Sequence, residues 1–122
     1  MANPFVHIEL TTDDPVGAKD FFGKLLDWKL EDLPMEDDVY TIIHVGDRGA
    51  GGAITKTPAP GIPTRWLPYI EVDDVAKKTA LTTKLGGRVE VDKTEVPGMG
   101  WFAVITDPTG GVVGLWEPMN PE

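Results

Sequence analysis

The side chains of this chain that are best suited to chemistry are its two histidines, His7 and His44, and the carboxylates near them. The chain has no cysteine and no serine, so thiolate metal sites, disulfides and the two commonest nucleophiles are excluded. The phosphate-binding glycine motifs and the nucleophile elbow of hydrolases are absent as well. Imidazole and carboxylate groups remain, and they can hydrogen-bond a ligand, move a proton or bind a metal ion.

His7 lies in a β-prone segment, residues 5–10, in which the side chains alternate. Glu9 shares the face of His7 because strand side chains repeat every two residues. One interpretation makes His7 a hydrogen-bonded residue that lines a cavity, and the other makes it a metal ligand or a general base. His44 lies in another apolar strand, residues 40–45, has no partner motif, and is expected to be structural or exposed.

A second group of candidate side chains lies in the segment 66–72, where Leu67, Tyr69 and Glu71 share one face. Glu71 could join the histidine and glutamate of the first segment in a site with one nitrogen and two oxygen ligands. The alternative is that both glutamates lie lower on their strands and pair with nearby Lys or Arg. The residues alone leave these alternatives open.

The elements that must position these side chains begin with strands at residues 5–10, 28–30, 40–45 and 53–56, with a turn at Asp37-Asp38. Asp13-Asp14-Pro15 is typical of a helix start, because an acidic cap precedes a proline in the first turn. Five apolar residues then recur at helical spacing and predict one buried stripe: Ala18, Phe21, Phe22, Leu25 and Leu26.

The proline- and glycine-rich segment 57–64 is typical of a linker, and the order of elements then repeats. Strands are predicted at residues 66–72, 88–92, 101–106 and 112–117, and a turn at Asp107-Pro108-Thr109-Gly110. Asp73-Asp74 begins a helix that Gly86-Gly87 ends, and its buried side is expected to hold Val75, Ala80, Leu81 and Leu85. The segment 96–100 is either a mobile loop over a ligand or a hairpin connection.

The two halves share their acidic pairs and their flanking strands in the same order, with Ile8-Glu9-Leu10 corresponding to Ile70-Glu71-Val72. This self-similarity predicts an α+β fold of two βαβββ modules in one domain, residues 1–122. Module one covers about residues 4–56, the linker about 57–64 and module two about 65–118. An unrelated ferredoxin-like α+β domain is the alternative.

Three ordered segments of the chain resemble the motifs of one family. The first runs from His7-Ile8-Glu9-Leu10 through Phe21-Phe22 to Leu26-Asp27-Trp28. The second is Leu67-Pro68-Tyr69-Ile70-Glu71-Val72-Asp73-Asp74-Val75, and the third is Asp107-Pro108-Thr109-Gly110 followed by Val113-Gly114-Leu115-Trp116-Glu117. In this order and spacing they resemble the vicinal oxygen chelate (VOC) superfamily of glyoxalases, bleomycin-resistance proteins and extradiol dioxygenases.

The resemblance implies that each module curls its strands into a cup, and that four strands of metal-dependent members supply the ligands of one divalent ion. The corresponding positions here are His7 on the first strand, Leu67 or Tyr69 on the fifth, Gly114 on the eighth, and Gly52 or Ile54 on the fourth. His7 is the one residue that matches, whereas a tight site needs three or more protein donors. No cofactor is therefore expected, and a divalent metal is the less favoured alternative.

The function implied by the resemblance is the binding of a small organic molecule in the cup without the usual metal. The expected ligand-binding residues are His7, Glu9, Trp66, Leu67, Tyr69, Glu71, Trp101 and Gly114. The alternatives are a metal-dependent lyase, isomerase or dioxygenase of the same superfamily, and an accessory domain that acts through protein contacts. The resemblance also implies a homodimer.

The net charge and the hydropathy of the chain limit the kinds of partner that it is expected to bind. The formal net charge of −9 at pH 7 would repel a phosphate backbone, so no nucleic acid is expected to bind. The apolar runs are too short to span a membrane, and the first residues lack the features of a secretory signal. Together with the absence of cysteine, these features predict a cytoplasmic protein whose partners are a small molecule and a second copy of the chain.

Overall fold

The computed structural model describes residues 2–34, 39–57 and 60–120. The expected turn at Asp37-Asp38 and part of the expected linker lie outside the described residues. The chain divides into two compact units. The N-terminal unit is His7–Leu67, and the C-terminal unit joins Met1–Val6 to Pro68–Glu122. Each unit is described by itself below.

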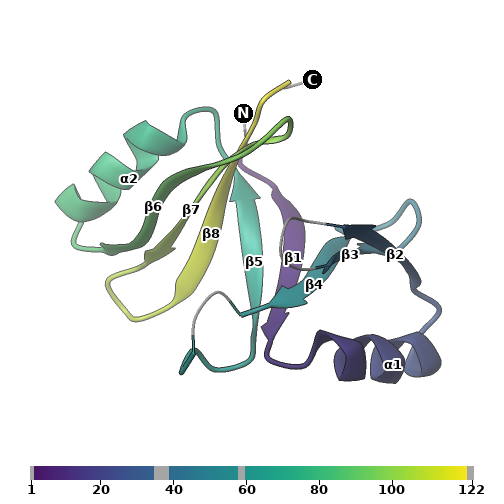
Figure 1. The fold of residues 1–122 in the computed structure, drawn as a ribbon. Helices are drawn as coiled ribbons and strands as arrows, with labels where there is room; N and C mark the ends of the chain where they lie inside the picture. The colour runs from purple at the N-terminus through teal and green to yellow at the C-terminus, as the bar shows by residue number, and fades with distance from the viewer. Residues whose placement is uncertain (1, 35–38, 58–59, 121–122) are drawn as a thin grey trace. The chain divides into compact units, whose positions relative to one another are not determined.

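The N-terminal unit contains one helix and a sheet with the strand order β2-β3-β4-β1 (Figure 1). Strand β1 pairs with β4 in parallel, while β4 with β3 and β3 with β2 pair antiparallel. The elements are β1 (Phe5–Thr12), α1 (Pro15–Leu25), β2 (Lys29–Pro34), β3 (Val39–His44) and β4 (Gly52–Lys56). This is the βαβββ order that the sequence predicts for the first half.

The C-terminal unit repeats this topology with the strand order β5-β8-β7-β6. Strand β5 pairs with β8 in parallel, and the other pairs are antiparallel. The elements are β5 (Arg65–Glu71), α2 (Val75–Lys84), β6 (Arg88–Val96), β7 (Gly100–Thr106) and β8 (Val112–Pro118). The predicted α+β class and its duplicated βαβββ motif are confirmed.

Both helices begin where the acidic pairs predict. Asp14 and Asp74 are the N-cap residues, and their carboxylates accept hydrogen bonds from the third amide beyond each, at 2.9 Å for Gly17 and 3.1 Å for Lys77. Each bond satisfies an amide that has no partner within the helix. Helix α2 ends at the predicted glycine, since Gly86 adopts a φ of 91°, a left-handed conformation that favours glycine.

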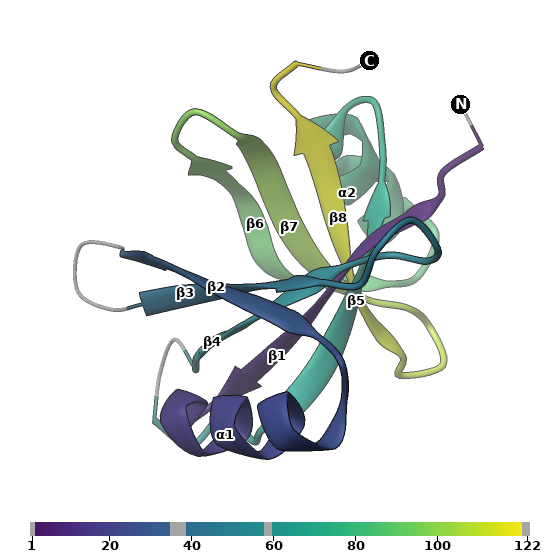
Figure 2. The same ribbon diagram turned by 90° about the vertical axis from the view of Figure 1, so that its right-hand side faces the viewer.

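Helix α1 lies across one face of the N-terminal sheet (Figure 2), but the predicted apolar stripe is only partly buried. Ala18 and Phe22 pack against the buried side chains of Leu10, Ile43 and Ile54. The neighbouring row of the helix is exposed instead, at 58% for Phe21 and 60% for Leu25. The five apolar residues span a wider strip of the helix surface than the sheet covers, so part of that strip stays exposed.

The predicted buried side of α2 is also corrected by the structure. Val75 is fully buried in a cluster with Val72, Ala103 and Leu115. The other buried residue of the helix is Thr79, one turn further on, and its hydroxyl donates to the carbonyl of Ala76 at 2.9 Å. Ala80, Leu81 and Leu85 are exposed. The local hydrogen bond explains why a threonine can replace an apolar residue at this position.

Strand β6 extends to Val96, beyond the predicted end at Asp92. It is the last strand of the C-terminal order, and its polar residues are exposed, so no hydrophobic alternation marks its length. Pairing with β7 extends it to a tight turn, in which the Met99 amide donates to the Val96 carbonyl at 3.0 Å. The segment 96–100 is therefore a hairpin connection.

The turn at Asp107-Pro108-Thr109-Gly110 is confirmed. The Asp107 carboxylate accepts hydrogen bonds from the hydroxyl and amide of Thr109, both at 2.6 Å, and these bonds lower the pKa of Asp107. The amide of Gly110 donates to the Asp107 carbonyl at 3.0 Å. Within the described residues, neither helix is long and apolar enough to cross a membrane.

Replacement of the α2 cap should destabilise the protein, with its neighbour as a matched control. Asp74→Ala removes the bond to the Lys77 amide and is expected to lower the free energy of unfolding by about 1 kcal/mol. Asp73→Ala removes an exposed carboxylate of the same type and should change stability by less than about 0.5 kcal/mol. Urea unfolding followed by circular dichroism measures both; equal effects would contradict the capping role.

Candidate functional site

A chain of three polar side chains crosses one face of the N-terminal sheet. His7 and Glu9 lie on β1, and Tyr40 lies on β3. The Tyr40 hydroxyl donates to Glu9 Oε2 at 3.0 Å, and His7 Nε2 lies 3.0 Å from the same hydroxyl oxygen. The side chains of His7 and Glu9 keep only 29% and 13% of their surface exposed. The phenol therefore connects the imidazole to the carboxylate within a partly buried site.

The position of Tyr40 depends on the strand that separates it from β1. Strand β4 lies between β1 and β3, and its Ala53 pairs with Glu9 on one side and with Ile42 on the other. The two outer strands are then about 10 Å apart, which is two strand spacings. Ala53 is fully buried and carries only a methyl group, so the long tyrosine side chain can pass over β4 to Glu9.

The hydrogen bonds settle which atoms carry protons. A carboxylate only accepts, so the single hydroxyl proton of Tyr40 is donated to Glu9. With Glu9 ionised, the matching arrangement has a proton on His7 Nε2 that is donated to the Tyr40 oxygen. Burial lowers the pKa of His7, because desolvation penalises the charged imidazolium. The site thus holds a neutral imidazole in a defined tautomer at pH 7.

Two further buried polar atoms lie on β1 and β5. Among the described residues, Thr11 Oγ1 and Arg65 Nε are the buried side-chain polar atoms without a hydrogen-bond partner. Thr11 shares the face of Glu9 by the two-residue period of β1. The hydroxyl of Thr64 donates to that of Thr12 at 3.3 Å, so the first residues of β5 lie beside the last residues of β1.

At the equivalent position of the C-terminal unit, an aromatic ring packs on a glycine. Tyr69 pairs directly with Gly114, and a β-carbon on Gly114 would overlap the Tyr69 ring. Tyr69 is only 7% exposed, and its ring also contacts Phe102 edge-on at 6.4 Å. No donor side chain can replace Gly114 while the tyrosine keeps this position.

The remaining predicted ligand-binding residues lie in separate surroundings. Leu67 is buried, and the backbone amide of Glu71 donates to the Pro4 carbonyl at 2.9 Å. Trp66 packs against Phe22 and Trp28 in the N-terminal unit, with ring centroids 5.6 and 6.2 Å away.

Trp101 lies on the face of β7 opposite Phe102, because neighbouring residues of a strand point to opposite sides. Lys93 lies over its ring at 4.9 Å and also approaches Glu117 at 3.9 Å. Glu117 in turn accepts a hydrogen bond from the Val75 amide at the start of α2. Trp101 is therefore not on the face that carries Tyr69 and Phe102.

The structure brings together His7 with Glu9, and Tyr69 with Gly114. Sequence analysis missed Tyr40 as a site residue, although its position two and four residues before Ile42 and His44 places all three on one face of β3. His44 pairs with Glu31 at 2.8 Å and is exposed, as predicted.

The residues do not fit the divalent ion of the metal-dependent family members. No group of three His, Asp or Glu side chains that could hold a metal ion occurs within residues 2–34, 39–57 and 60–120. His7 Nε2, one of its two possible ligand atoms, is engaged with Tyr40. Gly114 offers no donor, and the ring of Tyr69 fills the space beside it.

Comparisons with known proteins give relatives of several kinds. The chain is 31% identical over 111 residues to a putative glyoxylase, CFP32, of Mycobacterium tuberculosis, covering 90% of this chain and 42% of the relative. It is 26% identical to the anthracycline biosynthesis protein DnrV of Streptomyces peucetius, covering 89% of this chain and 45% of the relative. The chain thus spans less than half the length of these curated relatives.

Solved structures share the fold. A hypothetical protein, BH1468, from Bacillus halodurans matches 100% of this chain and 99% of its own with a TM-score of 0.72 and 14% identity. A methylmalonyl-CoA epimerase from Mycobacterium tuberculosis matches 95% of this chain and 88% of its own with a TM-score of 0.68 and 15% identity.

A family model matches residues 5–115, nearly the whole chain, and the duplicated βαβββ topology agrees with it. The chain belongs to the Glyoxalase/Bleomycin resistance protein/Dioxygenase superfamily.

Proposed function

We propose that this protein binds a small organic molecule over the His7–Tyr40–Glu9 chain without a divalent metal. The observation that carries the proposal is the hydrogen-bonded chain itself, with two links of 3.0 Å. Its side chains are oriented by one another, so a ligand would meet donors and acceptors that need little further ordering. Burial of His7 and Glu9 strengthens any hydrogen bond made there.

The ligand class follows from the atoms along β1 and β5. Thr11 Oγ1 and Arg65 Nε are buried without partners among the described residues, and both can donate a hydrogen bond. A buried donor without a partner costs free energy, which a ligand acceptor would recover. Arg65 adds a positive charge, so we propose that the molecule carries an acidic group, such as a carboxylate, directed toward Thr11 and Arg65 and away from the negative charge of Glu9. The names of the relatives, a glyoxylase, an anthracycline biosynthesis protein and a methylmalonyl-CoA epimerase, accord with small-molecule chemistry.

Small carboxylic acids should bind better than their amides. Titration of ¹⁵N-labelled protein with matched pairs of small acids and amides is expected to shift amide signals of β1 and β3 saturably for some of the acids. Tyr40→Phe keeps the ring but removes the hydroxyl that orients His7 and Glu9, and should weaken binding by about tenfold, since a hydrogen bond to a charged group contributes about 1.5 kcal/mol. Tyr69→Phe is the matched control in the C-terminal unit. Equal binding of acids and amides would contradict the ligand class, and unchanged affinity in Tyr40→Phe would contradict the site.

The dialysed, untagged protein should contain well below one divalent ion per chain. His7 is the one residue at an expected ligand position, and three or more donors are needed for tight binding. Elemental analysis by mass spectrometry measures the content of Ni, Zn, Mn and Fe. A near-stoichiometric metal that is lost in His7→Ala would instead support the metal-dependent lyase, isomerase or dioxygenase.

The stability of the protein should fall with the protonation of His7. Burial lowers the pKa of His7 in the folded state below its value of 6.5 in the unfolded chain, so its contribution is complete above 6.5 and is lost as the pH falls below it. Between about pH 7.5 and about pH 5.5, the wild type is expected to lose more unfolding free energy than His7→Gln, by up to about 1.4 kcal/mol for each unit by which the pKa is lowered.

The exposed His44 provides the control for this measurement. Urea unfolding at both pH values gives the loss for each variant, and His44→Gln should not reduce the wild-type loss. An equal loss in the wild type and His7→Gln would show that His7 is not held neutral by the fold.

A further inference from the structure

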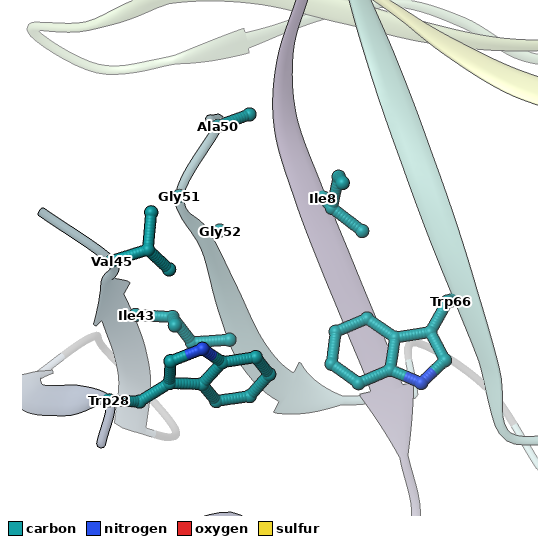
Figure 3. A pocket seen from close by; sticks show the side chains of 8 residues that line it. All are labelled: Ile8, Trp28, Ile43, Val45, Ala50, Gly51, Gly52 and Trp66. Carbon is teal, nitrogen blue, oxygen red and sulfur yellow. The ribbon is translucent and has the colours of Figure 1, made fainter. Parts of the chain in front are cut away.

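We propose a second ligand site, an apolar pocket on the other side of β1, which takes one aromatic ring of a small planar molecule. The pocket has a volume of about 90 Å³ and lies wholly within the N-terminal unit (Figure 3). Ile8 lines it, and Ile8 lies between His7 and Glu9 in the strand, so its side chain points away from them. The pocket is therefore distinct from the polar chain and does not depend on the proposed function.

Two indole rings form adjoining walls. Trp28 and Trp66 have their ring centroids 6.2 Å apart at an interplanar angle of 75°, and Figure 3 shows both rings beside the same space. Phe22 packs against Trp28 at 5.3 Å and against Trp66 at 5.6 Å, which supports both rings from α1. Trp66 remains 42% exposed, so part of its ring surface is available to a ligand.

Next to β3 and β1, the pocket is lined by the backbone of Gly51 and Gly52, which have no side chains. A β-carbon on Gly52 would overlap the carbonyl oxygen of Ile8, and one on Gly51 would lie 2.7 Å from the carbonyl oxygen of Ile43. The two glycines let the neighbouring strands approach closely, and they line the pocket without a side chain that would fill it. The walls of the pocket are otherwise apolar, with Ala50, Ile43 and Val45 completing the lining and no charged residue.

The size and lining of the pocket select the ligand. An enclosed apolar cavity of about 150 Å³ binds benzene, so this smaller pocket of about 90 Å³, which opens to solvent, takes one ring that inserts only partly. Aromatic rings prefer offset or edge-to-face contacts at about 4.5–7 Å, and the two indoles present their surfaces for such contacts. A helix or strand backbone is too large for a space of this volume, so we assign it to a small molecule, and the concentration test below detects a side chain of a second copy instead.

Toluene is a suitable probe, and the indole N–H signals of the four tryptophans report its position. In ¹H–¹⁵N spectra assigned with single Trp→Phe variants, toluene should shift the signals of Trp28 and Trp66 saturably, while those of Trp101 and Trp116 stay within the error. Cyclohexane, which is apolar but not planar, should bind at least threefold more weakly. Equal binding of cyclohexane would overturn the planar ligand class.

A variant that fills the pocket with an added side chain provides a second test. Ala50→Phe places a ring in the pocket from its lining loop, and it is expected to weaken toluene binding at least tenfold. Ala80→Phe adds the same ring to the exposed face of α2 and should leave binding unchanged. The proposal is overturned if toluene causes no saturable shift, or if Ala50→Phe binds as the wild type does. It is also overturned if the Trp66 signal moves with protein concentration alone, because a second copy of the chain would then cover the pocket.

Discussion

The parallel pairing of the first and last strands of each βαβββ motif is the contact on which both units depend. Strand β1 meets β4 where a side chain on Gly52 would overlap the Ile8 carbonyl, and β5 meets β8 where the ring of Tyr69 covers Gly114. A short hairpin cannot connect parallel strands, and in each unit a helix and two further strands form the long connection. In the N-terminal unit, the two faces of β1 also differ in polarity. One face carries His7 and its polar partners, and the other lines the apolar pocket.

Structural features that depend only on interactions within a few residues of the chain could be predicted from the sequence. Asp14 and Asp74 bond amides of the next turn, and Gly86 supplies a backbone angle, so neither needs a distant partner. The buried side of each helix and the end of β6 could not be predicted in the same way. They depend on which row of a helix the sheet covers and on how far an edge strand continues to pair, and both are set by residues far along the chain.

In the candidate site, too, the local part could be predicted from the sequence and the long-range part could not. The period of a strand places Glu9 beside His7, but Tyr40 joins them across β4, and that contact depends on the register of two strand pairs. The prediction that Trp66 and Leu67 would line one cavity conflicts with the alternation of strand side chains, and the structure places Trp66 with the aromatic residues of the α1 side. Solved structures at 14% and 15% identity share the fold, so the fold is specified by patterning that tolerates a change of most side chains.

The packing of Tyr69 over Gly114 has a consequence for how the family's chemistry can change. A single substitution that placed a carboxylate at position 114 would clash with the tyrosine ring before it could approach a metal, and a smaller side chain at position 69 alone would leave a void beside a glycine. Either single substitution is therefore expected to destabilise the unit, whereas a paired exchange at the two positions could avoid both the clash and the void. Positions 69 and 114 are therefore coupled, and a change of the side chain at one of them requires a change at the other.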